Sequence, residues 1–301
     1  MVKIGYSPIY KYNLPDGHRF PMEKYTLLPQ QLMYENTVNE DAFFSPVPLS
    51  IEQLGSTHSQ EYLNKLETLT LSRKEIRDIG FPVTKALIER GKHIAGATYQ
   101  CAKFALDYGC ALNIAGGTHH SFRDRGEGFC VFNDFAIAAH LILEQQIVRK
   151  ILIIDLDVHQ GNGTARIFQN NNKVFTFSMH GARNYPLRKE TSDLDIHLPD
   201  KTQDNYYLMT LETTLEPLIE KVRPDIIFYL SGVDILESDK LGRLSVTKEG
   251  CKKRDEQVFG LCQKFEIPVA VSMGGGYSEK LADIIDAHAN TYRVAIDHYG
   301  I

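Results

Sequence analysis

The chain has 301 residues, of which 43% are hydrophobic, with a formal net charge of −5 and an isoelectric point of about 6.1. This composition suits a sizeable core. Because charges of both signs are interspersed, it gives no support for intrinsic nucleic-acid binding, which usually shows as a basic domain or stripe. No apolar stretch approaches the roughly 18 residues of a membrane span, so we expect no membrane partner. No linker, low-complexity run or repeat divides the chain, and residues 1–301 are predicted to form one domain.

The first residues, MVKIGYSPIY, lack the apolar segment of a secretory signal. We therefore expect an intracellular protein, cytoplasmic or, in a eukaryote, alternatively nuclear. The five cysteines are odd in number and contain no CxxC pair. We expect them to be reduced and mostly buried, so a Cys-ligated zinc is not predicted. They are Cys101, Cys110, Cys130, Cys251 and Cys262.

Short β-type runs alternate with helical patterns along the chain. Strands are predicted at 2–7, 110–116, 150–157, 173–179, 225–232 and 268–276, and helices near 85–108, 134–147, 205–222, 248–265 and 278–295. Several of the strands are continuous apolar runs, which are typical of strands covered on both faces. The alternation predicts an α/β domain with a largely parallel sheet.

Polar residues or glycines follow four of these apolar strands directly, in NIAGGTHH, IIDLDVHQG, FYLSGVD and VSMGGGY. Ordinary turn chemistry also places Gly and Asp at strand ends. In open α/β sheets, however, ligands bind where the carboxyl ends of the strands meet. Four such ends together predict one shared site.

A metal site is predicted from the spacing in IDLDVHQGNG. Asp157 and His159 are two residues apart, so an extended backbone points both the same way, with Asp155 one step earlier. Asp234 ends another apolar strand. Together Asp157, His159 and Asp234 offer two oxygens and one nitrogen and leave a position open, as in catalytic zinc sites. The alternative, a capped loop, leaves two carboxylates at the end of an aliphatic strand, where burial is costly. The same ligands would also accept Fe²⁺ or Co²⁺.

The tandem histidines His119 and His120 follow two glycines, Gly116 and Gly117, that allow a tight turn. Imidazole titrates near neutral pH, so the pair can share base and acid duty, although two surface histidines would look the same. Each ring needs a partner for its second nitrogen, and Asp155 and Asn162 are the candidates.

Tyr277 follows three glycines in GGGY, at the end of another strand. A phenol there could donate a hydrogen bond to a developing oxyanion, although GGGY could also be merely a loop before a helix.

At this point the sequence resembles a known family, the zinc-dependent histone deacetylases. Five stretches occur in the order that the family uses and together span almost the whole chain. They are LPDGHRFPMEKY (14–25), GGTHHSFRDRGEGFCVFND (116–134), ILIIDLDVHQGNGT (151–164), GVDILESDKLGRLSVT (232–247) and MGGGY (273–277). The resemblance implies the arginase/deacetylase α/β fold, with a central parallel sheet of about eight strands.

The resemblance also implies a role for each site residue. Zinc would be bound by Asp157, His159 and Asp234, with His119 and His120 as acid and base, Asp155 and Asn162 behind them, and Tyr277 polarising the amide carbonyl. The acyl-lysine tunnel would be formed by Phe129, Tyr185, Gly128 and Gly276, and a structural potassium would be bound by Asp155, Asp157, His159 and Ser178.

Two positions depart from the best-known branch of the family, which has a second histidine and an aspartate where this chain has Gln160 and Asn162. An uncharged Asn162 does less to raise the pKa of His120, so His120 is predicted to be the more easily neutral ring and His119 the better cation. These two residues and GHRFPMEKY resemble the class IV group and bacterial deacetylase-like proteins. No clear match to that branch's acidic rim residue is found.

The predicted reaction is hydrolysis of an acyl-lysine amide, on an acetyl or longer group of a histone or another protein, by metal-activated water. Three alternatives stay open. Acetylated small molecules such as acetylpolyamines could be the substrates, or the chain could be a catalytically silent acyl-lysine binder. A two-metal ureohydrolase of the same fold would need further Asp and His ligands, which the sequence does not offer near the motif.

Overall fold

The structure, a computed structural model, describes residues 2–300 and is built on one eight-stranded sheet. All neighbouring strands pair in parallel. In spatial order the strands are β2 (Phe43–Phe44), β1 (Lys3–Gly5), β3 (Cys110–Asn113), β8 (Val269–Ser272), β7 (Ile226–Leu230), β4 (Ile151–Asp155), β5 (Val174–Gly181) and β6 (Leu194–Leu198). The largely parallel α/β sheet predicted from the sequence is confirmed.

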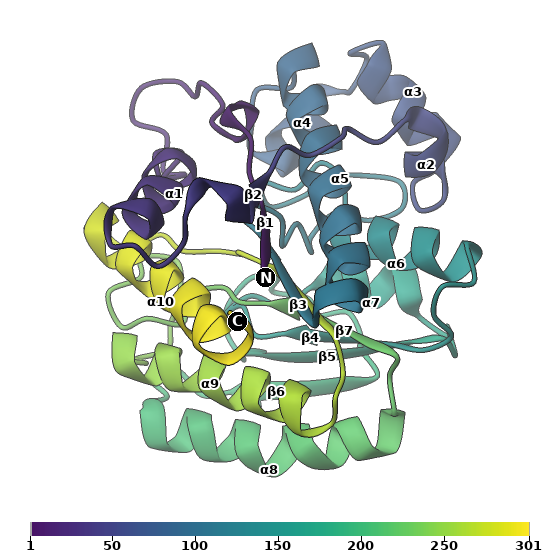
Figure 1. Cartoon of the computed structure of the whole chain (residues 1–301). Coiled ribbons are helices and arrows are strands. Elements are labelled where there is room, and N and C mark those ends of the chain that lie inside the picture. Colours follow the sequence, from purple (N-terminus) through teal and green to yellow (C-terminus); the bar gives the residue numbers. More distant parts are fainter. Residues whose placement is uncertain (1, 301) are drawn as a thin grey trace.

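Helices cover both faces of this sheet (Figure 1). On one side lie α5 (Lys85–Tyr108), α6 (Asp134–Glu144) and α7 (Asn162–Phe168), and on the other lie α8 (Asp204–Val222), α9 (Lys248–Lys264) and α10 (Leu281–Tyr299). The N-terminal third adds α1 (Lys24–Tyr34), which packs on α10, together with α2 (Ile51–Gly55), α3 (Gln60–Glu67), α4 (Arg73–Ile79) and the 3-10 helices Pro8–Tyr10 and Glu40–Ala42.

The central strands β3, β4, β7 and β8 are buried at every position. Strands in this position must be apolar on both faces, which explains the continuous hydrophobic runs that identified them. The five cysteines are free and buried, as predicted.

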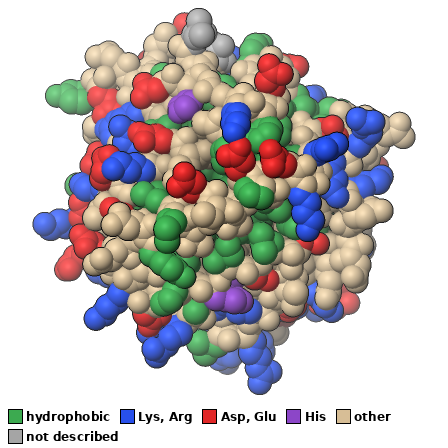
Figure 2. All heavy atoms as spheres, turned by 90° about the horizontal axis from the view of Figure 1, so that it is seen from below, with side chains coloured by type: hydrophobic (Ala, Val, Ile, Leu, Met, Phe, Trp, Pro, Cys, Tyr) green, Lys and Arg blue, Asp and Glu red, His purple; other side chains and the backbone are tan. Residues whose placement is uncertain are grey.

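Charged side chains of both signs are interspersed on the face seen in Figure 2, which views the molecule from the side of α8. Among the described residues, no helix is both long enough and apolar enough to cross a membrane.

Candidate metal and acid–base centre

The site lies where the carboxyl ends of β3, β4, β7 and β8 meet, as the four motifs predicted. The loop after β3 approaches the loop after β8 so closely that a Cβ on Gly117 would lie 2.7 Å from the Cα of Gly274. Gly116 and Gly117 have φ angles of 87° and 68°, which favour glycine, and this loop carries both histidines.

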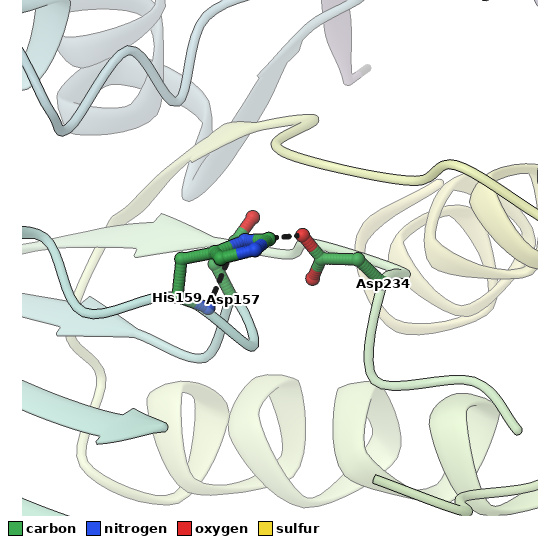
Figure 3. Close-up of side chains that lie close together, drawn as sticks. All are labelled: Asp157, His159 and Asp234. Carbon is green, nitrogen blue, oxygen red and sulfur yellow. Dashed lines mark hydrogen bonds and ion pairs between the residues drawn. The ribbon is translucent and has the colours of Figure 1, made fainter. Parts of the chain in front are cut away.

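Asp157, His159 and Asp234 form a buried cluster whose ligand atoms all lie within 4.8 Å of one another. Figure 3 shows Asp157 and His159 on one loop facing Asp234 on another. The Nδ1 atom of His159 lies 3.0 Å from Oδ1 of Asp157 and 3.1 Å from Oδ2 of Asp234. These separations are close to those of ligands that each lie about 2 Å from one ion. The donor set therefore fits a divalent metal.

The backbone places these ligands differently from the predicted alternation. Strand β4 ends at Asp155, so Asp157 and His159 lie beyond the strand, and period-two geometry is the wrong reason for their convergence. Instead, successive carboxylates fold the loop. The amide of Asp157 donates to Asp155 (3.2 Å), and the amide of His159 donates to Asp157 (3.0 Å). Asp155 itself turns toward His119 rather than toward the cluster.

Electrostatics in the cluster show how strongly its members interact. Burial alone would lower the pKa of His159, but hydrogen bonds to Asp157 and Asp234 raise it to about 10. Burial and the neighbouring carboxylate of Asp157 raise the pKa of Asp234 to about 7. Buried acids held this close together need a compensating positive charge, and a bound cation would supply it.

His119 has a carboxylate partner. Its Nδ1 donates to Oδ2 of Asp155 at 2.7 Å, and its Nε2 lies 3.9 Å from Oδ1 of Asp157. Burial opposes the charged ring, but the charges of Asp155 and Asp157 dominate and raise its pKa to about 9. This direction favours the cationic form of His119, which the sequence predicted to be the better cation of the pair.

His120 has an amide partner. Its Nδ1 lies 2.7 Å from Oδ1 of Asn162, and its ring centroid is 4.1 Å from that of His119. Burial and the neighbouring charges of His119 and His159 keep its pKa well below the ordinary value. This lowered pKa agrees with the prediction from the sequence that His120 is the more easily neutral ring.

Tyr277 lies in the wall of the same cavity, with its ring centroid 6.4 Å from that of His159. Burial and the charges of Asp234 and Asp157 raise its pKa well above 10, so the phenol keeps its proton. Its loop is fixed at several points. The amide of Tyr277 donates to Asp239 (2.6 Å), and the amide of Gly275 donates to Asp157 (2.9 Å).

Two connected cavities lead to these groups. An outer cavity of about 370 Å³ and an inner one of about 40 Å³ share His120, His159, Gly128, Phe129 and Tyr277. Tyr185 lines the outer cavity, where its ring lies 4.9 Å from that of His120. Both predicted aromatic walls therefore lie at the site.

Two other predicted residues lie less directly at the site. Gly276 does not belong to the described lining of either cavity. A Cβ there would meet Val233, at 2.6 Å, and His288. Ser178 lies opposite Asp155 in strand register and hydrogen-bonds His180 Nδ1 at 2.9 Å.

Sequence reasoning missed several residues that shape the site. Lys24 is buried beneath the Tyr277 loop and donates to the carbonyl of Gly274 at 3.1 Å. Phe20 packs against Phe129 and Tyr277 at centroid distances of 5.3 and 5.9 Å. Both residues lie in the stretch GHRFPMEKY that contributes to the family resemblance, but nothing in the sequence assigned either of them a contact at the site, so only the fold reveals these contacts.

Comparison with known proteins agrees with this geometry. Residues 18–292 match the family described as the histone deacetylase domain, and the chain belongs to this family, with the arginase/deacetylase fold. It is 31% identical over 296 residues to histone deacetylase 2 of Arabidopsis thaliana, a match that covers 94% of this chain and 76% of that protein. The family supports a hydrolytic deacetylase activity.

Two bacterial relatives are also similar. An uncharacterised protein of Picosynechococcus sp. is 40% identical over 296 residues, covering 98% of this chain and 99% of that protein. The acetoin utilization protein AcuC of Staphylococcus aureus is 27% identical, covering 89% and 74%. Among solved structures, an HDAC homolog complexed with SAHA superposes with a TM-score of 0.83 at 26% identity, covering 99% of this chain and 84% of that one.

Proposed function

We propose that this chain is a zinc-dependent hydrolase that removes a short acyl group from an acylated lysine side chain in a protein or peptide. The observation that carries the proposal is the buried cluster of Asp157, His159 and Asp234, of which Asp157 and His159 line the same cavity as His119 and His120. Zinc held by these three residues would supply Lewis-acid activation of water and of the acyl carbonyl. Among residues 2–300 no second ligand group adjoins the cluster, which favours one-metal chemistry over that of a ureohydrolase.

The protein groups divide the proton transfers. Neutral His120 accepts a proton from the attacking water as its oxygen bonds to the acyl carbon. The phenol of Tyr277 donates a hydrogen bond to the carbonyl oxygen as negative charge develops there. When the carbon–nitrogen bond breaks, cationic His119 gives its proton to the leaving lysine nitrogen. The products are the carboxylic acid and the free amine.

A structural potassium is part of the proposal. Asp155 ends β4 and pairs with Ser178 of β5, and Asp157 and His159 lie on the loop after β4; backbone carbonyls of this region and the Ser178 hydroxyl could hold a monovalent cation. We also propose that the chain is a class IV-like member of the family. The proposal is supported by Gln160, which stands where the best-known branch has a histidine and whose side chain hydrogen-bonds the backbone of Glu190 and the carboxylate of Asp195.

Cavity size supports a short acyl group. A cavity needs about 10–15 Å³ to hold one water-sized group. The inner cavity of about 40 Å³ therefore has room for roughly three such groups. This volume favours an acetyl group over an octanoyl or myristoyl chain in the inner cavity.

The positive charge around the outer cavity favours an acyl-lysine peptide with acidic neighbours as the substrate over an acetylpolyamine. Arg19, Arg183 and Arg243 line the outer cavity, against one carboxylate, Asp78. Arg183 and Arg243 share Asp200, at 3.5 and 3.3 Å, whereas Arg19 stacks on the ring of Phe129. A cationic rim repels the free ammonium groups of a polyamine and attracts acidic side chains.

The test is a panel of lysine peptides that carry acetyl, butyryl, octanoyl or myristoyl groups, with aspartate or lysine flanks, and an acetylated diamine. We expect acetyl turnover that His120→Ala abolishes, and a several-fold higher kcat/KM for acidic flanks at low salt. Arg19→Glu should reduce that preference. Arg149→Glu, at a residue whose side chain is 93% exposed, should not. Preferred hydrolysis of the diamine would reject the peptide assignment.

A further inference from the structure

The side-chain amide of Asn162 contacts His120 through its oxygen and the carboxylate of Glu127 through its nitrogen. We propose that Glu127 is a positioning residue that acts on His120 through Asn162, fixing which ring nitrogen of His120 carries the proton. This inference rests on the proposed function for its consequence in catalysis. Its geometric basis is a continuous series of contacts from Arg125 through Glu127 and Asn162 to His120.

The amide of Asn162 has one acceptor end and one donor end, and its two neighbours fix which end faces each way. Its Oδ1 lies 2.7 Å from Nδ1 of His120, and its Nδ2 donates to Oε2 of Glu127 at 3.4 Å. Turning the amide over would place its oxygen against the Glu127 carboxylate, which can only accept. The carboxylate therefore holds the oxygen of Asn162 toward His120.

An amide oxygen can only accept, so Nδ1 of His120 must be the nitrogen that carries hydrogen. In a neutral ring the lone pair then lies on Nε2. That nitrogen is the proton acceptor required of the base in the proposed reaction. Glu127 thus determines the tautomer of His120 without touching the ring.

Glu127 is itself held rigidly. The carbonyl of Glu127 accepts from the amide of Cys130 at 2.8 Å across a turn in which Gly128 and Phe129 have φ angles of 53° and 69°. Two positive φ values across an i to i+3 hydrogen bond define a type I′ turn. The amides of Gly128 and Phe129 are in turn bonded to the backbone at the end of α4.

Both oxygens of the Glu127 side chain accept hydrogen bonds. Oε1 accepts from Nε of Arg125 at 2.9 Å, and Oε2 accepts from the Tyr185 hydroxyl at 2.8 Å as well as from Asn162. A glutamine cannot reproduce this pattern, because whichever way its amide points, its NH₂ end faces a donor. The contact between residues 127 and 162 requires one carboxylate and one amide, with the NH₂ group of the amide facing the carboxylate.

The test exchanges the two groups in a double-mutant cycle on the zinc-loaded protein with an acetyl-lysine peptide. Glu127→Gln should lower kcat about 10-fold with little change in KM, the lower end of the range for groups that orient a site residue. Asn162→Asp should also lower kcat, because two carboxylates then face each other. The double variant that combines both substitutions should recover to within a few-fold of wild type, because the new carboxylate at position 162 can accept from His120 and from the new amide at position 127.

Asp124→Asn is the matched control. It makes the same acid-to-amide change in the same loop, but Asp124 pairs on the surface with Nη1 of Arg125, whereas Glu127 accepts from Nε of that residue. Its kcat should equal that of wild type. A double variant that combines the two losses additively, or Glu127→Gln with unchanged kcat, would overturn the proposal.

Nitrogen-15 NMR of labelled histidines separates this proposal from the proposed function. In wild type, Nδ1 of His120 should resonate as a protonated nitrogen and Nε2 as an unprotonated one, and Glu127→Gln should mix the two tautomers. A wild-type protein with this signature but without turnover would leave the positioning role standing and reject the hydrolase. An unchanged His120 tautomer in Glu127→Gln would reject the positioning role whatever the turnover.

Discussion

At the scale of single residues, the two adjacent histidines are both buried, but only His119 has a carboxylate behind it that offsets the cost of burying a charged ring. Asp155 contacts His119 directly at 2.7 Å, whereas His120 contacts the uncharged Asn162 at the same distance. The pKa of His119 is raised to about 9 and that of His120 is lowered. The sequence predicted both partners and the direction of the difference, because a carboxylate stabilises a cation and an amide does not. It could not reveal Glu127, which becomes a neighbour only after the turn at 127–130 folds.

A residue-scale prediction concerns the Tyr277 hydroxyl. Tyr277→Phe removes the phenolic donor and keeps the ring that packs against Phe20 and Phe129. Loss of one oxyanion donor should lower kcat roughly 100-fold, with metal content unchanged. Single-turnover kinetics alongside metal analysis would measure this. A variant within a few-fold of wild-type kcat would exclude Tyr277 as the donor.

At the scale of elements, strand ends were predictable and the loops that complete the site were not. The carboxyl ends of β3, β4, β7 and β8 do converge, but β4 stops at Asp155, and hydrogen bonds place the residues beyond it. The predicted helices near 85–108 and 248–265 are confirmed almost to the residue. The helix predicted for 278–295 instead begins at Leu281 and ends at Tyr299. Helix α1 contains Pro29, which weakens its helical pattern, whereas β6 (LDIHL) does show the period-two alternation of a strand but was not predicted.

The start of α6 supports the histidine loop. Asp134 accepts hydrogen bonds from the amides of Gly117 and Thr118, and the amide of Asn133 donates to Nε2 of His58 at 3.1 Å. Burial lowers the pKa of His58 from 6.5 to about 4. Between pH 4 and pH 6.5 the imidazole of His58 binds a proton more readily in the unfolded chain than in the folded protein. The contribution of neutral His58 to the free energy of unfolding is therefore fully present above about pH 6.5 and is lost as the pH falls toward 4.

We therefore predict that the free energy of unfolding decreases as the pH falls from 6.5 to 4, by roughly 2–3 kcal/mol from His58 alone. His58→Gln keeps an acceptor for the Asn133 amide but cannot titrate, so its pH dependence should be shallower. Guanidinium denaturation at several pH values would measure both slopes. Identical slopes in the two proteins would remove His58 as the cause.

At the scale of the whole molecule, an all-parallel sheet of eight strands brings residues from four distant stretches of the chain to one edge. The sheet was predicted from continuous apolar runs that alternate with helical segments along the chain, because parallel strands covered on both faces must be apolar. The short edge strand β2 and the N-terminal helices carry weaker patterns and emerged only in the fold. The face seen in Figure 2 mixes both charges, whereas three arginines from three separate loops meet at the mouth of the outer cavity.

The most direct test of the central proposal is stepwise return of zinc to chelator-treated protein while acetate release from an acetyl-lysine peptide is followed. Because Asp157, His159 and Asp234 form one buried ligand group, turnover should vanish without metal and return in full at about one zinc per chain. Asp234→Asn should neither retain the zinc nor regain activity. Acetate release that persists in metal-free protein, or that returns equally in Asp234→Asn, would contradict metal-dependent hydrolysis at this site.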